Sequence, residues 1–157
     1  MGLALAAALL TAPALLQGKS AKPLDEQVRH ELVMLPYYGV FDTLSFRLDG
    51  STVTLMGQVT RPTLKSDAEK VVEHIAGVSS VDNRIEVLPL SRFDDRIRLA
   101  ELRAVYGNSA LFRYNLGAIP RIRIIVKNGN VVLEGVVATS GDKDIAGIAA
   151  SAVSGVF

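Results

Sequence analysis

Between residues 45 and 87 the spacing of apolar residues changes twice, and this pattern restricts the fold more than any other feature of the sequence. On both sides of Asp49-Gly50, apolar and polar residues alternate, as in a β-hairpin closed by a tight turn. From 64 to 75 the apolar spacing becomes three and four residues, as on one face of a helix. Alternation then returns after Gly77, which is placed as a left-handed helix cap. The segment is therefore predicted to form strand, strand, helix, strand.

Further elements are predicted on both sides of this segment. Apolar residues from Leu24 to Leu35 recur on one face of a helix, which Pro36 ends. A second series starts at Ser91, an N-cap residue with Asp94 three positions on, as in a capping box. This helix is followed by two more strands and a helix, at residues 121–126, 131–137 and 140–153.

The second series repeats the first at a constant offset of 78 residues. The matched pairs are Val53 and Val131, Leu55 and Leu133, Gly57 and Gly135, Val59 and Val137, Ile75 and Val153, Gly77 and Gly155, and Val78 and Val156. We therefore predict an α+β protein with two α-β-β-α-β domains, each with two helices on a small three-stranded mixed sheet. The second copy stops at Phe157, before its last strand. Two explanations stay open: the sequence is truncated, or a partner strand fills the vacant position.

The repeated unit resembles the BON domain, named after bacterial outer-membrane and nodulation proteins. The resemblance lies in Leu55-x-Gly57-x-Val59, in Gly77-Val78-x-x-Val81-x-Asn83-x-Ile85-x-Val87, and in Leu133-x-Gly135-x-Val137 with Gly155-Val156. It implies a tandem-domain exported protein that binds phospholipid or protects the envelope under osmotic stress, without catalysis. Lipid-binding residues are not part of the family's fixed motif.

The motif residues themselves are expected to be structural: Gly57, Gly77, Asn83, Gly135 and Gly155. A glycine inside a strand marks a bulge or a close approach, and we expect the following helix to approach Gly57 and Gly135. The Asn83 amide is expected to bond local backbone at the strand edge.

The N-terminal segment, residues 1–21, has the pattern of a secretory signal. An apolar run is followed by Ala12-Pro13-Ala14, and the run is too short to span a bilayer. The interpretation is a periplasmic or otherwise exported protein, soluble after signal removal, with domains at 22–90 and 91–157; the alternative is an N-terminal helix packed on the domain. The sequence contains no cysteine, which excludes disulfides, a thiol nucleophile and an acylated cysteine anchor.

The sequence does not indicate a catalytic centre, a cofactor or a metal. It has no phosphate-binding loop and no dinucleotide fingerprint. His30 and His74 lie on helices beside acidic residues, without a nucleophile near them in sequence, and are interpreted as surface residues. The acidic pairs Asp94-Asp95 and Asp142-x-Asp144 fall at helix starts, where the helix dipole favours carboxylates.

Charge is distributed unevenly between the two repeats. Residues 24–90 hold 6 Lys and Arg against 10 Asp and Glu, whereas residues 91–157 hold 9 against 6. Such asymmetry indicates either an anionic partner for the basic half or packing of the two halves on each other. We predict an anionic phospholipid or membrane surface as the partner, and no nucleic acid. The candidate lipid-binding residues are Arg96, Arg103, Arg113, Arg121 and Arg123. The alternative is an assembly module, in which the second domain pairs with a partner strand or with itself.

Overall fold

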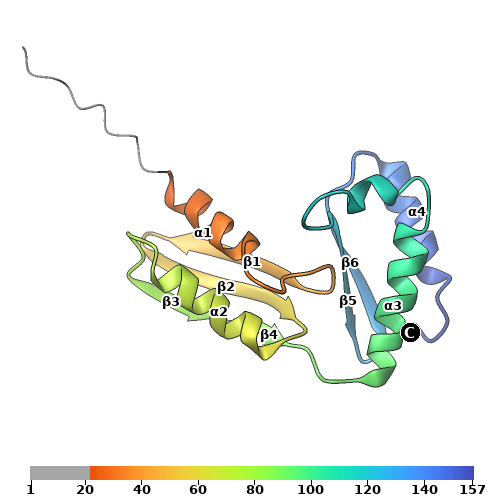
Figure 1. Ribbon diagram of the computed structural model, residues 1–157, viewed down its shortest axis with the longest axis horizontal. Coiled ribbons are helices and arrows are strands. Elements are labelled where there is room, and N and C mark those ends of the chain that lie inside the picture. The colour runs from red at the N-terminus through yellow and green to blue at the C-terminus, as the bar shows by residue number, and fades with distance from the viewer. Residues whose placement is uncertain (1–21) are drawn as a thin grey trace, which may run out of the picture.

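The computed structural model describes residues 22–157, so the predicted secretory segment lies outside the described residues. Figure 1 shows two bodies side by side, each with its helices on one side of a small sheet. The first contains α1 (Leu24–Val33), β1 (Thr43–Asp49), β2 (Thr52–Val59), α2 (Pro62–Glu73), β3 (Ser80–Asn83) and β4 (Glu86–Val87). The second contains α3 (Arg92–Tyr106), the short 3-10 helix η1 (Phe112–Asn115), β5 (Ile122–Lys127), β6 (Asn130–Gly135) and α4 (Ser140–Ser151). The α+β class is therefore confirmed.

The first domain has a mixed sheet in which β2 is central. β1 pairs with β2 antiparallel, and β3 and β4 both pair with β2 in parallel. The third strand, predicted as one piece, is thus divided after Asn83. The amide nitrogen of this residue donates to the Lys65 carbonyl at 2.9 Å and to Glu69 at 3.1 Å, and its amide oxygen accepts from the Ile85 backbone. Asn83 therefore makes the predicted local backbone bond and also joins the break in the strand to α2.

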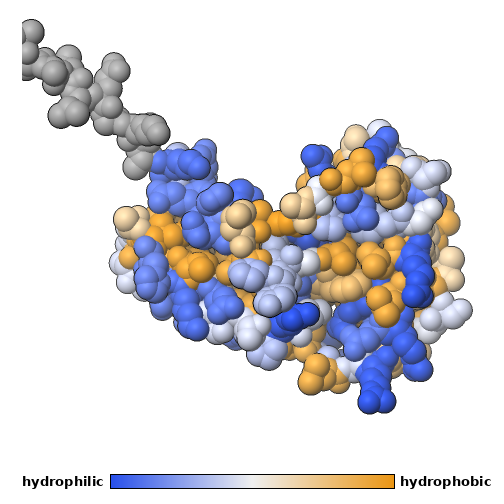
Figure 2. All heavy atoms as spheres, in the orientation of Figure 1, coloured by the Kyte–Doolittle hydropathy of each residue, from blue (hydrophilic) through white to orange (hydrophobic). Residues whose placement is uncertain are grey.

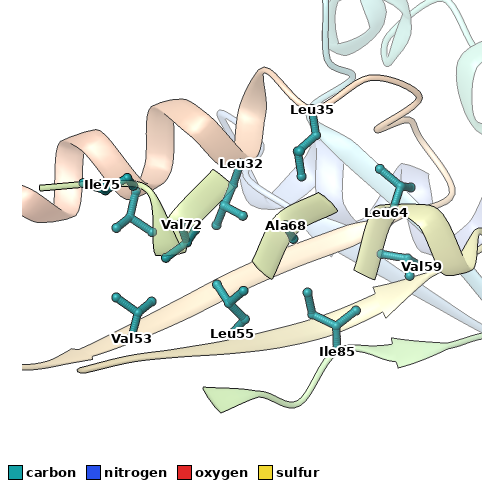
Figure 3. Packing of buried hydrophobic residues seen from close by; sticks show 11 residues of the cluster. Leu32, Leu35, Val53, Leu55, Val59, Leu64, Ala68, Val72, Ile75 and Ile85 are labelled. Carbon is teal, nitrogen blue, oxygen red and sulfur yellow. The ribbon is translucent and has the colours of Figure 1, made fainter. Parts of the chain in front are cut away.

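The core of the first domain lies between its sheet and the two helices (Figure 3). Leu32 and Leu35 approach from α1 and the residues after it, and α2 adds Leu64, Ala68 and Val72. Beneath them lie Val53, Leu55 and Val59 of β2, all fully buried, and Ile85 between β3 and β4. Ile85 is 1% exposed, so the third strand is an integral part of this core.

The second domain has the same layout with a shorter sheet. β5 and β6 pair antiparallel, and within residues 22–157 no third strand pairs with β6. Ser91 caps α3 as predicted, because its hydroxyl accepts from the Asp94 backbone at 3.1 Å. The Asp94 carboxylate does not complete a capping box; it accepts the backbone N–H groups of Asn128 and Gly129 instead. It thereby ties the start of α3 to the β5–β6 turn.

Equivalent glycines in the two domains have equivalent neighbours. A Cβ on Gly57 would overlap the Thr43 carbonyl of β1, and one on Gly135 would overlap the Arg121 carbonyl. The close neighbour is therefore the paired strand, and the predicted approach of the following helix is wrong. The register pairs Gly57 with Leu44 inside the ladder and Gly135 with Ile122 as its last pair, one residue against one in both cases, so neither glycine marks a bulge.

The glycines after the second helix of each domain have the predicted backbone conformation. Gly77 has φ 100° and Gly155 has φ 89°, the left-handed region in which a chain turns out of a helix. In the described part of the chain, no helix has both the length and the apolar character that crossing a bilayer requires.

Candidate functional site

Arg96 and Arg103 lie on the solvent-facing side of α3. Together with Arg92 and Leu99 they form what we call the α3 stripe, because positions 92, 96, 99 and 103 follow the spacing of one helix face and all four residues are exposed. Figure 2 shows hydrophilic residues along the outer side of α3 and apolar side chains over the adjoining strands.

The start of the α3 stripe lies next to an exposed aromatic pair. Phe93 and Phe157 have ring centroids 6.4 Å apart and are 40% and 85% exposed. The Arg96 guanidinium lies 5.8 Å from the Phe93 ring. The neighbouring acid, Asp95, is paired with Arg98 at 2.6 Å, which offsets its charge. The α3 stripe therefore places exposed arginines next to exposed apolar side chains.

Arg123 lies in the interface between the two domains. Its guanidinium donates to the Gly39 carbonyl at 2.9 Å and stacks 4.7 Å from the centre of the Tyr38 ring. Burial raises the pKa of the Tyr38 hydroxyl, while the nearby Arg123 charge opposes that rise. On the same strand, the Ile124 N–H donates to the Val40 carbonyl at 2.9 Å. Arg123 thus holds the first domain against β5.

Further polar contacts cross the same interface. Lys127 pairs with Glu86 at 2.5 Å, and the Thr43 hydroxyl donates to Glu134 at 2.8 Å. Hydrogen bonds from Gln58 and Lys127 lower the pKa of the Glu86 carboxyl. Arg121 is exposed and lines, together with Arg123 and Arg29, a groove of about 460 Å³ between the domains. The structure therefore brings Arg121 and Arg123 together, apart from the α3 stripe.

Arg113 lies apart from both the α3 stripe and the interdomain groove, in a hydrogen-bond network around the buried Asp142. One carboxylate oxygen of Asp142 accepts from Thr139, Tyr114 and Arg113 at 2.8, 2.8 and 2.5 Å. These bonds, that from Thr139 first, lower the pKa of the Asp142 carboxyl, and the bonds to Tyr114 and Asp142 raise the pKa of Arg113. The arrangement anchors η1 to the start of α4, so Arg113 is occupied within its own domain.

Sequence reasoning missed two buried charged residues on the inner face of α3, which do not pair with each other. Arg98 donates to the Val126 carbonyl at 2.7 Å, and the Glu101 carboxylate is fully buried without a hydrogen-bond partner. Burial raises the pKa of Glu101 to about 7. Position 101 lies four residues from both Ile97 and Val105 on the apolar face of the helix. That spacing is the signal that would have identified it.

A groove opens between β6 and α4, where the first domain has its third strand. It measures about 400 Å³, and we call it the β6–α4 groove. Its apolar lining includes Val131, Leu133, Val137, Ala146, Ala150 and Val156. Val131, Leu133 and Val137 are partly exposed, whereas Val53, Leu55 and Val59, their equivalents in the first domain, are fully buried.

The side chains that could serve in acid–base chemistry or metal binding lie away from the α3 stripe and from the two grooves described above. His30 and His74 are exposed and line a shallow groove between α1 and α2. Among residues 22–157, no three His, Asp or Glu side chains come together as a metal-binding group.

Limited proteolysis tests whether Arg123 holds the two domains together. Arg123→Ala should loosen the contact, because it removes a hydrogen bond and a cation–π contact worth about 1 kcal/mol each. Cleavage at Leu88–Ser91 should then be about 10- to 30-fold faster, provided that it follows domain opening. Arg121→Ala, at the exposed position directly before β5, is the matched control. Equal cleavage rates for both variants would show that Arg123 does not hold the domains together.

The fold and the surface together define the class of protein to which the chain belongs: a tandem repeat of small α+β domains with grooves and exposed arginines on the surface. A family model described as "BON domain" matches residues 42–89 and 94–156. The chain therefore belongs to the BON domain family, and the resemblance seen in the sequence is confirmed. BON domains are generally non-enzymatic, and membership indicates a non-catalytic, envelope-associated protein.

Apart from the family model, comparisons with known proteins find only low similarity. No curated protein matches the chain. Among solved structures, the chain is similar to the C-terminal domain of CdsD, titled the structural protein of the Type III secretion system of Chlamydia trachomatis. The identity is 14% and the TM-score 0.33, with 87% of this chain and 94% of that chain covered. A second CdsD structure from Chlamydia trachomatis gives 12% identity and a TM-score of 0.32, covering 85% and 88%.

Proposed function

We propose that the protein is exported and binds anionic phospholipid surfaces through the α3 stripe, without catalysis. The observation that carries this proposal is the stripe itself: three arginines and Leu99 on one exposed helix face, next to the Phe93–Phe157 pair. Arginine side chains at a membrane surface reach phosphate groups while aromatic and aliphatic groups lie at the level of the headgroups. A role in protecting the envelope under osmotic stress is the function we propose for this binding.

Of the five arginines predicted as lipid contacts, Arg96 and Arg103 are therefore the ones we propose for this role. Arg113 and Arg123 are engaged with Asp142 and with Tyr38 and Gly39. Releasing them to a lipid would break contacts within the protein. Arg121 is exposed but lies in the interdomain groove, away from α3.

Sedimentation with vesicles tests the proposal. The chain should bind vesicles containing anionic phospholipid, and high salt should weaken the binding because it screens the charges. Each arginine near such a surface contributes about 1 kcal/mol, so Arg96→Glu with Arg103→Glu should reduce binding by about 30-fold or more. Neutral phosphatidylcholine vesicles should bind little.

The control makes the same change of charge on the first domain. Arg47→Glu with Lys70→Glu alters two exposed residues of β1 and α2. If this double variant loses binding as strongly as the α3 variant, net charge rather than the α3 stripe determines association, and the proposed site is wrong.

A further inference from the structure

We propose that the interdomain groove binds a small soluble phosphate monoester, whose phosphate group contacts arginines of both domains. The groove measures about 460 Å³ and opens between the start of β1 and the start of β5. Figure 2 shows the surface hollowed between the two bodies. The groove shares no residue with the α3 stripe, so its ligand can be tested independently of the proposed binding to lipid surfaces.

Positive charge is concentrated around the groove. Arg29 of α1 lines it from the first domain, and Arg121 and Arg123 line it from the second. Within the described part of the chain, none of these three arginines is paired with a carboxylate, and Glu134 is the only acid in the lining. The Glu134 carboxylate already accepts the Thr43 hydroxyl. A concave surface with an excess of one charge attracts ions of the opposite charge, so the groove should attract an anion.

Two of the three arginines are held in position before a ligand arrives. One terminal nitrogen of Arg123 donates to the Gly39 carbonyl, and its guanidinium stacks on the Tyr38 ring. The Arg29 guanidinium lies 5.8 Å from the centre of the Phe46 ring. The remaining N–H groups of both side chains have no acceptor among the described residues. Because these side chains are already ordered, a ligand that uses the remaining donors loses less entropy on binding.

The geometry of guanidinium groups favours a phosphate monoester as the anion. Each guanidinium presents its N–H groups in a planar fork that matches the oxygens of a phosphate or a carboxylate. A carboxylate has two oxygens, whereas a phosphate monoester has three terminal oxygens and close to two negative charges at neutral pH. Three arginines from two domains therefore suit the monoester better. The lining also includes Leu44, Ile119 and Pro120, against which a short carbon skeleton can pack.

Calorimetric titration with glycerol 3-phosphate tests the proposal. We expect saturable one-to-one binding that weakens as sodium chloride screens the charges, and no binding of glycerol. Arg29→Ala and Arg121→Ala should each weaken binding by about tenfold or more, because each removes charge-assisted hydrogen bonds. Arg47→Ala, at an exposed position of β1 outside the groove, is the matched control and should bind as the native chain does.

Glu134 provides a change in the opposite direction. Glu134→Gln removes the negative charge from the lining, while the new amide oxygen can still accept the Thr43 hydroxyl. The variant should bind glycerol 3-phosphate about three- to fivefold more tightly, because the carboxylate no longer repels the phosphate. Damage to the fold cannot raise the affinity, so this variant separates an effect on the site from an effect on stability.

Binding should also hold the domains together, because the ligand contacts both of them. A ligand that binds only the closed arrangement suppresses opening in proportion to its concentration relative to Kd. With glycerol 3-phosphate at about ten times Kd, cleavage at Leu88–Ser91 should be about tenfold slower, provided that it follows domain opening. Arg121→Ala should lose most of this protection at the same concentration of the ester.

Three results would overturn the proposal. The first is the absence of saturable binding of glycerol 3-phosphate. The second is binding that Arg29→Ala and Arg121→Ala leave unchanged, which would place the ester elsewhere on the protein. The third separates a soluble ester from a lipid, since phosphatidic acid carries the same phosphate monoester in a vesicle. If these two variants abolish sedimentation with phosphatidic acid vesicles, while glycerol 3-phosphate does not slow cleavage of the native chain, the groove holds a membrane headgroup instead.

Discussion

Replacing Glu101 by glutamine should raise the free energy of unfolding of the second domain by about 3 kcal/mol at pH 8. The carboxylate is fully buried without a partner, and burial raises its pKa from 4.5 to about 7. The folded state therefore binds a proton that the unfolded state has released. The free energy of unfolding falls as the pH rises from about 4.5 through about 7. Each pKa unit by which the folded state exceeds the unfolded state costs about 1.4 kcal/mol once the pH lies above both values. Glutamine removes this cost at every pH.

Hydrogen exchange of the β5 amides in increasing urea, at pH 5 and pH 8, measures this effect. The gain from Glu101→Gln should fall below about 1 kcal/mol at pH 5, because this pH lies only about half a unit above the unfolded pKa and the stability difference has only begun to build up. Glu73→Gln, at an exposed position of α2, is the matched control and should change little at either pH. A gain from Glu101→Gln that is the same at both pH values would show that the buried charge is not its cause.

Replacing Gly57 by alanine should destabilise the first domain by about 3 kcal/mol or more. The new Cβ would overlap the Thr43 carbonyl, which belongs to the backbone of β1 and cannot move without breaking strand pairing. The residue also has φ 126°, which alanine rarely adopts. Gly135→Ala should have a similar effect on the second domain, because its Cβ would meet the Arg121 carbonyl.

Thermal unfolding of the glycine variants provides the measurement, and α4 contains the control. Gly147 lies inside the helix with no atom near its missing Cβ. Gly147→Ala should therefore stabilise the protein by about 1 kcal/mol, because alanine favours the helix. If Gly57→Ala unfolds at the wild-type temperature, the strands must separate easily at this point, and the proposed close approach does not constrain them.

The sequence predicted the order of the elements because each change of hydrophobic period coincides with a change from strand to helix. The offset of 78 residues also identified equivalent positions correctly, down to the neighbours of Gly57 and Gly135. The division of the third strand was missed, since it depends on a contact from Asn83 to α2, far from it in sequence.

The candidate site was less predictable than the fold. Alternation correctly predicted that Arg121 and Arg123 lie near each other, and both line the interdomain groove, although β5 begins one residue after Arg121. It did not reveal that Arg123 contacts Tyr38 and Gly39, because the packing of one domain on the other leaves no periodic signal in either. Counting charges likewise gave Arg98 the same weight as Arg96, although the first is buried and the second exposed.

The hydrogen bond from Ile124 to Val40 has a consequence for how the protein avoids aggregation. Its donor lies on the side of β5 that faces away from β6, where an unpaired strand would recruit other chains. The loop before β1 covers this point, so the first domain shields its neighbour against edge-to-edge polymerisation. Produced without the first domain, the second domain would expose this edge of β5 and should form fibrous or insoluble material. The tandem arrangement therefore protects solubility as well as adding a second copy of the fold.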